Sequence, residues 1–267
     1  MCARIRALAK RVRLDQLLVQ RELAPSRERA QALILAGAVR VDGDRADRAA
    51  APVSLDAQVA VDAGPRYVSR GGDKLAGALD ALSIDVVGKV AIDVGSSTGG
   101  FTDVLLQRGA ARVHAVDVGK GQLDWGLRND ARVVVHEGVN AREAVPVDEP
   151  VDLVVADVSF ISLRLALPPA LAKLREGGDV IALVKPQFEA GREAVGKGGV
   201  VRDPAARAAA VVAVARDLVA RGFGTLAVAA SPIAGREGNR EIFVHARKAA
   251  DGLGDAALTV AARQASE

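Results

Sequence analysis

Short apolar runs alternate with longer segments of helical spacing from residue 74 to residue 247. Runs rich in valine, isoleucine and leucine are typical of buried strands, whereas apolar residues three and four positions apart are typical of a helix face. The predicted strands are residues 89–95, 112–119, 132–138, 151–159, 179–185, 225–231 and 239–247. The predicted helices are residues 74–82, 101–109, 163–177 (interrupted at Pro168 and Pro169) and 203–222.

The order of these elements predicts the fold class. Strands that alternate with helices form a parallel sheet covered by helices on both faces. No helix separates the last two strands, so we expect them to pair antiparallel. The sequence therefore predicts an α/β domain with a mostly parallel seven-stranded sheet and an antiparallel last strand.

The chain before residue 63 follows another pattern. Helical spacing recurs twice, at Leu14, Leu17 and Leu18 and again at Ala30, Leu33 and Ile34. Ser26 is suited to begin the second helix and Gly37 to end it. Short strands follow, so two helices packed on a small sheet are predicted. We place a small α+β domain at 1–63, a linker rich in Gly and Pro at 64–72, and the α/β domain at 73–267.

Positive charge is concentrated in the smaller domain. The first forty residues contain nine Lys or Arg against three Asp or Glu, although the whole chain has a net charge of only +3. A basic module on a nearly neutral body favours a polyanionic partner, and a solvated charged face is the equal alternative.

The single cysteine, Cys2, excludes an internal disulfide and favours the cytoplasm. No apolar run is long enough for a membrane span, and we expect no secretory signal.

A glycine-rich loop, Gly95-Ser-Ser-Thr-Gly-Gly100, joins a predicted strand to a predicted helix. Such a loop lets a ligand approach the backbone and the free N–H groups of the helix. Ser97 stands where a nicotinamide fingerprint needs its second glycine, and the Lys of a P-loop is absent. Asp117 ends the next strand, where an acid can accept hydrogen bonds from a ribose. The pattern indicates a nucleoside ligand.

Four polar residues lie where strands or helices begin or end. Asp157 and Lys185 end strands, and Glu241 opens an antiparallel one, so all three are predicted at the edge that carries the glycine loop. Lys74 begins the helix that leads into the sheet. Each residue alone is also typical of a solvated turn. The histidines His114, His136 and His245 show no metal-ligand spacing, and we expect structural roles and no metal.

Residues 13–43, "RLDQLLVQRELAPSRERAQALILAGAVRVDG", resemble the S4-type RNA-binding domain. The resemblance implies that the second helix and adjoining basic residues contact RNA phosphates. The matching positions are Arg13, Arg27 and Arg29.

The larger domain is similar to FtsJ-type Rossmann-like class I methyltransferases, which use S-adenosylmethionine. The matching segments include "DVGSSTGGFTDVLL", "VVADVSFISL" and "LVKPQFE". With "SRGGDKL", "GNREIF" and the basic module, nearly the full chain resembles the TlyA family, ribosomal RNA 2′-O-methyltransferases historically labelled haemolysins. The resemblance implies these cofactor-binding residues: Gly95, Ser97, Thr98, Gly99, Phe101, Asp117, Asn140 and Asp157.

The same resemblance implies a catalytic tetrad of Lys74, Asp157, Lys185 and Glu241. A ribose hydroxyl is a poor nucleophile while protonated, so Lys185 is expected to act as the base or to polarise the 2′-oxygen. Asp157 would orient that lysine. Residues 186–203 are expected to form a mobile loop beside the site, with a plain surface loop as the alternative. The competing functions are a membrane-active haemolysin and a non-catalytic RNA-binding factor.

Overall fold

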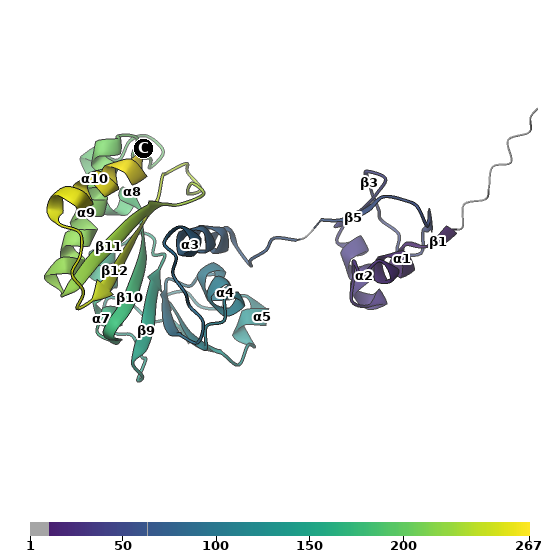
Figure 1. Cartoon of the computed structure of the whole chain (residues 1–267), viewed down its shortest axis with the longest axis horizontal. Coiled ribbons are helices and arrows are strands. Elements are labelled where there is room, and N and C mark those ends of the chain that lie inside the picture. The colour runs from purple at the N-terminus through teal and green to yellow at the C-terminus, as the bar shows by residue number, and fades with distance from the viewer. Residues whose placement is uncertain (1–10, 63) are drawn as a thin grey trace, which may run out of the picture. The chain divides into compact units, whose positions relative to one another are not determined.

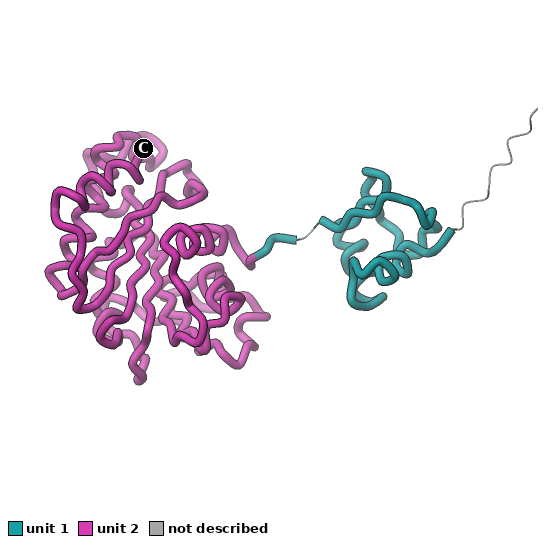
Figure 2. The backbone as a smooth tube through the Cα atoms, viewed as in Figure 1, with its two compact units in different colours: residues 1–66 teal, residues 67–267 magenta. Residues whose placement is uncertain are grey.

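The structure is a computed structural model, and it describes residues 11–62 and 64–267. The chain divides into two compact units, Met1–Arg66 and Tyr67–Glu267, which Figure 2 colours separately. Within the described residues, no helix is both long and apolar enough to cross a bilayer. The residues of the basic segment that fall outside the described part of the chain are Cys2, Arg4, Arg6 and Lys10.

The first unit packs two helices with short strands. Its elements are β1 (Arg11–Arg13), α1 (Leu14–Gln20), α2 (Arg27–Leu35), β2 (Val39–Val41), β3 (Asp44–Arg45), β4 (Pro52–Ser54) and β5 (Val59–Val61). The strands form two small sheets, β1–β4 and β3–β2–β5, where the sequence predicted one. The chain between β3 and β4 has no regular structure, and it carries the backbone from one sheet to the other. The buried core is Leu14, Leu18, Ala24, Ala30, Ile34 and Val39.

Local chemistry sets the ends of α2. The Ser26 hydroxyl accepts a 3.2 Å hydrogen bond from the Arg29 backbone N–H, as expected of an N-cap. Gly37, at φ 73°, follows the helix in the left-handed conformation that favours glycine. Both predicted boundary signals are therefore confirmed.

The second unit is built on a seven-stranded sheet (Figure 1). Its strands are β6 (Val90–Val94), β7 (Arg112–Asp117), β8 (Val133–Glu137), β9 (Val151–Ala156), β10 (Leu174–Val184), β11 (Phe223–Ala230) and β12 (Ile242–Lys248). The strand order is β11-β12-β10-β9-β6-β7-β8. Strand β12 runs opposite to the other six strands and pairs antiparallel with β10 and β11, so the predicted class and the antiparallel pair are confirmed.

Helices cover both faces of this sheet. One face packs against α3 (Arg70–Ala81), α4 (Gly100–Gln107) and α5 (Trp125–Arg128). The other face packs against α6 (Leu163–Ala166), α7 (Pro168–Leu171), α9 (Pro204–Ala220) and α10 (Asp255–Ser266). Successive strand residues face opposite layers, yet both sets are buried, which explains the continuous apolar runs in the sequence.

Two helix predictions need correction. The segment 163–177 was expected to be one interrupted helix, but α7 ends at Leu171 and β10 begins at Leu174. An irregular stretch with Gly177 at φ 73° lets this strand start early beside β9. Helix α10 was not predicted at all. It is held by Arg207, a buried residue whose guanidinium donates hydrogen bonds to the Ser266 carbonyl.

The segment 186–203 contains regular structure. It includes α8 (Pro186–Glu189) and a 3-10 helix (Arg192–Ala194). The Glu189 carboxylate accepts 2.6 Å hydrogen bonds from the Ser162 hydroxyl and the Leu163 N–H. These contacts attach the start of the segment to the loop that leads into α6.

A topological switch lies between β6 and β9. From β6 the chain proceeds to β7 and β8 on one side, and then it returns to β9 on the other side. Connections leave the carboxyl ends of β6 and β9 in opposite directions, so a crevice opens between them, as is general for open parallel sheets. The glycine loop follows β6 and Asp157 follows β9.

Asp93 fixes the helix that follows the glycine loop. Its buried carboxylate accepts hydrogen bonds from the Thr102 N–H at 3.0 Å and from the Thr102 hydroxyl at 2.7 Å. Burial raises the pKa of Asp93 to about 7, and the nearby charge of Asp157 acts in the same direction. The first turn of α4 is therefore tied to β6 by a carboxyl group that is close to its titration point at neutral pH.

We expect Asp93→Asn to weaken the pH dependence of stability. The contribution of the neutral carboxyl to the free energy of unfolding is full below the ordinary pKa of 3.8, and it is lost as the pH rises through about 7. Asparagine can accept the Thr102 hydrogen bonds but cannot ionise. Urea unfolding measures how much the free energy of unfolding falls between pH 5 and pH 8. This fall should be smaller in the variant than in the wild type by on the order of 2 kcal/mol. Equal losses in both proteins would contradict the raised pKa.

Candidate active site and RNA-binding residues

A cavity of about 550 Å³ opens at the switch point between β6 and β9. Gly95 and Asp157, from the two flanking strands, both line it. Gly95 has φ 83°, and a Cβ there would lie 2.7 Å from the Asp157 carbonyl oxygen. Only glycine therefore lets the loop after β6 come this close to the end of β9.

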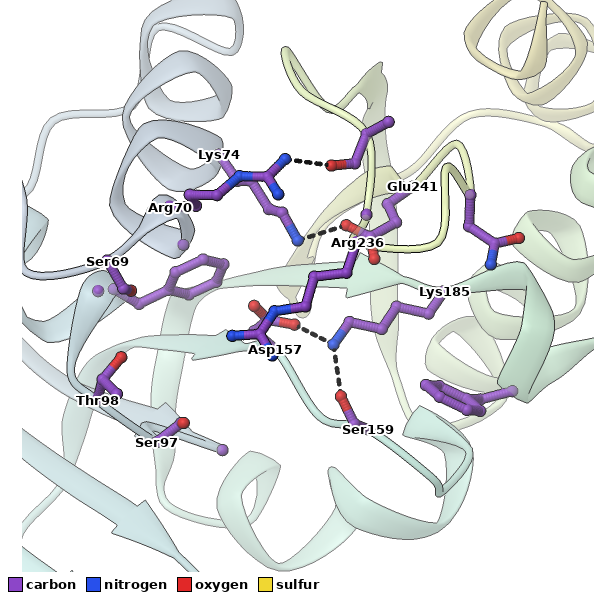
Figure 3. Close-up of a pocket in the computed structure, with 18 of the residues that line it drawn as sticks. Ser69, Arg70, Lys74, Ser97, Thr98, Asp157, Ser159, Lys185, Arg236 and Glu241 are labelled. Atoms are coloured by element: carbon purple, nitrogen blue, oxygen red, sulfur yellow. Dashed lines mark hydrogen bonds and ion pairs between the residues drawn. The ribbon is translucent and has the colours of Figure 1, made fainter. Parts of the chain in front are cut away.

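The four residues expected to act in catalysis line this one cavity (Figure 3). Lys185, which follows β10, places its Nζ 2.6 Å from Asp157 Oδ1. Lys74 of α3 donates a 2.6 Å hydrogen bond to Glu241 Oε2, just before β12. Lys74 and Glu241 are 167 positions apart in the sequence. The antiparallel direction of β12 brings its beginning to the carboxyl edge of the sheet, where the other three residues lie.

Lys185 has a second partner. Its Nζ donates a 2.8 Å hydrogen bond to the Ser159 hydroxyl, and its side chain is only 11% exposed. Two contacts fix the position of the amine at the cavity wall. A lysine held in this way can bind the oxygen of a substrate hydroxyl, and in its neutral form it can accept the proton of that hydroxyl.

The beginnings of two helices meet at the same cavity. Gly100 begins α4 and Arg70 begins α3. A Cβ on Gly100 would lie 2.3 Å from the Ser69 hydroxyl oxygen and 2.8 Å from the Gly72 nitrogen. The absence of a side chain at Gly100 thus allows the two helix N-termini to converge. Their free N–H groups favour a bound anion such as a carboxylate.

A second cavity of about 580 Å³ shares part of its wall with the first. The residues common to both cavities are Gly95, Ser97, Asp157, Ser159 and Phe160. Asp117 lines the second cavity, where its oxygens accept hydrogen bonds from Ser97 N–H at 2.8 Å and Gly119 N–H at 2.7 Å. Asn140 also lines it and donates a 2.6 Å hydrogen bond to Glu143.

These adjoining cavities fit S-adenosylmethionine, the cofactor that the resemblance implies. Each oxygen of Asp117 keeps a second lone pair that can accept a hydrogen bond from a ribose hydroxyl. The converging helix N-termini suit the methionine carboxylate, and Asp157 suits positive charge. Gly95, Ser97 and Asp157 line both cavities, so the two ends of one cofactor can lie on either side of them.

The remaining loop residues divide into two groups. Ser97, Thr98 and Phe101 line the first cavity, and Phe101 stacks on Phe243 with a centroid separation of 6.2 Å. Gly99 lines neither cavity. It has φ 97°, and a Cβ there would lie 2.3 Å from Leu127 of α5, so its place in the structure is a turn packed against that helix.

Sequence reasoning did not single out several residues that line the first cavity. They are Ser69, Arg70, Ser159, Phe160, Gln187 and Arg236. Ser69 and Arg70 lie inside "SRGGDKL", and Ser159 and Phe160 lie inside "VVADVSFISL", so these matched segments carried a usable signal. Arg236 lies in an irregular loop without periodicity, and nothing in the pattern distinguished it.

Two of the three expected RNA-binding arginines, Arg13 and Arg27, contact a buried acid in the first unit. Asp15 is 0% exposed, and both its oxygens accept hydrogen bonds from Arg13, at 3.1 and 2.8 Å. Arg27 at 3.3 Å and Gln31 at 3.0 Å donate to the same carboxylate. The hydrogen bonds from Arg13 hold the pKa of Asp15 well below its ordinary value. Arg29 is exposed, and its side chain has no partner among the described residues.

The three histidines make contacts at the sheet rather than at the cavities. His114 and His136 stack, with ring nitrogens 3.1 Å apart, and His114 also contacts Glu149 at 3.0 Å. Burial, with His114 beside it, lowers the pKa of His136. His245 lies 2.9 Å from the buried carboxylate of Asp179.

Comparison with known proteins agrees with both units. The FtsJ-like methyltransferase family matches residues 67–248, and the S4 domain matches residues 12–59. The 16S/23S rRNA (cytidine-2′-O)-methyltransferase TlyA of Mycobacterium tuberculosis is 51% identical over 91% of this chain and 92% of its own. Hemolysin A of Brachyspira hyodysenteriae is 39% identical over 88% of this chain and 99% of its own.

A solved structure has the same architecture. It is that of a Streptococcus thermophilus protein provisionally named a hemolysin, with 42% identity, a TM-score of 0.70 and 96% coverage of both chains. An S4 domain, an FtsJ-like domain and this degree of identity occur together along one chain. The chain therefore belongs to the TlyA family of S-adenosylmethionine-dependent methyltransferases.

Proposed function

We propose that this protein transfers the methyl group of S-adenosylmethionine to the 2′-hydroxyl of a cytidine in ribosomal RNA. The observation that carries the proposal is the Lys185–Asp157 pair, 2.6 Å apart, beside the glycine loop in one cavity. A second lysine–carboxylate pair, Lys74–Glu241, lines the same cavity. Such a set suits activation of a weakly acidic hydroxyl.

The choice of substrate is supported by the relatives. Proteins of Mycobacterium tuberculosis and Campylobacter jejuni, 51% and 36% identical, are named cytidine-2′-O-methyltransferases of ribosomal RNA. The S4 domain, with Arg13, Arg27 and Arg29 on it, supplies positive charge for RNA phosphates. We propose ribosomal RNA or a ribosomal subunit as the partner, and the cytoplasm as the place of action.

Lys185 acts on the nucleophile. In its neutral form the amine takes the proton of the 2′-hydroxyl as the oxygen attacks, and it becomes an ammonium; Asp157 and Ser159 keep the nitrogen in place. S-adenosylmethionine, when bound, supplies a methyl group on a positively charged sulfur. The carboxylate of Asp157 then compensates the charge of the ammonium that Lys185 becomes when it takes the proton.

Lys74 and Glu241 orient the substrate. Their hydrogen bond joins α3 to the start of β12, and both side chains are nearly buried. A rigid pair at this point can hold the ribose so that the oxygen and the methyl group stay in line. Alignment of reacting groups contributes up to ~7–11 kcal/mol in favourable systems.

The alternatives from the sequence have less support. A non-catalytic RNA-binding factor would not need both lysine–carboxylate pairs, and this chain retains them. A membrane-active haemolysin is suggested by the name of one relative, whereas the described residues contain no helix that could span a membrane. Both cavities are accounted for by a cofactor and a ribose.

The direct test is to map methylated riboses in ribosomal RNA. Purified protein with S-adenosylmethionine should add a 2′-O-methyl group to a defined cytidine of RNA from a strain that lacks the enzyme. Mass spectrometry of nuclease fragments identifies the nucleotide. Methylation of a base in place of a ribose, or no transfer to RNA or subunits, would contradict the proposal.

We expect Lys185→Ala to abolish methyl transfer. Loss of the group that takes the proton should lower the rate by at least about 10²–10⁴-fold. Calorimetry should show that the affinity for S-adenosylmethionine changes only about twofold, because Lys185 is placed on the hydroxyl. Lys173→Ala, at the amino end of the same strand, is the matched control. Substantial activity in Lys185→Ala would rule out this role.

We expect Arg27→Ala to weaken RNA binding and to lower its salt dependence. Removing one phosphate contact should reduce the slope of log affinity against log salt by about 1. The measurement is filter binding of ribosomal RNA across a series of salt concentrations. Arg263→Ala in α10 removes an exposed charge outside the S4 domain and should leave the slope unchanged. An unchanged slope in Arg27→Ala would argue against a phosphate contact.

A further inference from the structure

Arg236 is a cation of the active-site cavity that none of the described residues neutralises. It lines the cavity but forms no hydrogen bond or ion pair within the described part of the chain. The other cations of the wall are engaged. Lys74 pairs with Glu241, Lys185 pairs with Asp157, and Arg70 donates a 2.9 Å hydrogen bond to a backbone carbonyl.

The backbone around Arg236 is fixed on both sides. Before it, the Ala234 carbonyl accepts the hydrogen bond from Arg70. After it, Asn239 is 2% exposed, and its amide group bonds to the Gly199 carbonyl at 2.8 Å and the Val201 N–H at 3.0 Å. The Gly235 N–H also donates to the Asn239 carbonyl at 2.9 Å. Because these hydrogen bonds hold the turn, the backbone position from which the exposed side chain of Arg236 extends is fixed.

The side chain reaches over the reaction centre. Figure 3 shows Arg236 extending from the loop between β11 and β12 toward Asp157 and Lys185. In RNA, the carbon that bears the 2′-hydroxyl is bonded to the carbon that bears the 3′-phosphate. A ribose whose hydroxyl faces Lys185 must therefore carry a phosphodiester into the same neighbourhood.

We propose that Arg236 binds the phosphodiester on the 3′ side of the target ribose and so selects the nucleotide's position in the site. The inference rests on the proposed function and names a subsite for it. A guanidinium can bind two phosphate oxygens with parallel hydrogen bonds, which fixes both distance and orientation. Arg70, at the start of α3, positions the loop through Ala234.

The charge of the cavity wall agrees with an anionic group of this kind. The cationic side chains are Arg70, Lys74, Lys185 and Arg236, and the acidic ones are Asp157, Glu237 and Glu241. When Lys185 is neutral, as a base must be, the other three basic side chains balance the three acidic ones. S-adenosylmethionine, when bound, adds one net positive charge, and a phosphodiester carries one negative charge. Without the guanidinium, this anion would enter a partly enclosed site without a direct partner, which is unfavourable.

The experiment is a cycle that combines a protein change with an RNA change. The protein change is Arg236→Ala in the full chain. The RNA change is a neutral methylphosphonate, introduced by ligation at the phosphate 3′ to the methylated nucleotide. Each change alone should raise KM for RNA about tenfold to hundredfold, the range of a charge-assisted hydrogen bond. Together they should cost no more than one alone, and Arg236→Lys should recover part of the loss.

The controls separate this contact from a general effect of charge or folding. Arg240→Ala removes an exposed charge from the same loop but outside the cavity wall, and it should keep the wild-type KM. S-adenosylmethionine affinity and thermal unfolding of Arg236→Ala should match the wild type. A wild-type KM in Arg236→Ala, or penalties that multiply in the double change, would overturn the proposal.

The phosphate contact can still be tested if the protein does not catalyse the proposed reaction. If the wild type transfers no methyl group to RNA, filter binding of the native and methylphosphonate RNAs replaces KM. Affinities that depend on the substituted phosphate in wild type but not in Arg236→Ala support the subsite. Affinities that do not depend on it reject the subsite. A failure of catalysis is thus distinguished from a failure of the phosphate contact.

Discussion

The site depends on the close approach of two strand ends at the switch point of the sheet. Gly95 after β6 lies so near the Asp157 carbonyl that a Cβ would come within 2.7 Å of it. Gly95 and Asp157 line both cavities, so this close approach lies at the wall that the two cavities share. A side chain at Gly95 would separate the two strand ends, and it would therefore alter the wall of both cavities.

Charge compensation is the second constraint on this site. Two lysines line the wall of the first cavity, and each is paired with a carboxylate at 2.6 Å. Paired charges are acceptable in a partly buried site, whereas an isolated ammonium would lose solvation without return. The position of each pair also matches the role proposed for it. The pair at the ends of β9 and β10 lies beside the glycine loop, and the pair between α3 and β12 lies across the cavity.

The sequence predicted the sheet of the second unit well, because buried parallel strands are continuous apolar runs that few other structures produce. It failed at α10, whose sequence is rich in alanine and whose position depends on a distant contact from Arg207. It also misjudged the segment 163–177, where a strand begins within an apparent helix pattern.

Asp157 and Lys185 could be placed at the site edge from strand ends alone. Glu241 could be placed there as well, from the predicted antiparallel direction of its strand. Its contact with Lys74 could not be predicted, since only the folded chain brings together residues 167 positions apart. Arg236 gave no signal, because an exposed loop residue has no periodicity.

The arginines of the two units are prepared differently, and the difference suggests a division of labour in RNA recognition. Arg13 and Arg27 share the buried carboxylate of Asp15, which orients them before RNA arrives but also competes with phosphate for their N–H groups. Phosphate contacts made by such residues form and break readily, and their affinity depends on salt rather than on nucleotide identity.

Arg236 has no competing acid partner among the described residues, and hydrogen bonds hold its loop on both sides. A contact there depends on geometry. It is satisfied only when a phosphate and a 2′-hydroxyl on adjacent carbons enter together, a combination that DNA cannot present. We therefore propose that the S4 domain supplies affinity for RNA, while the cavity decides which ribose reacts.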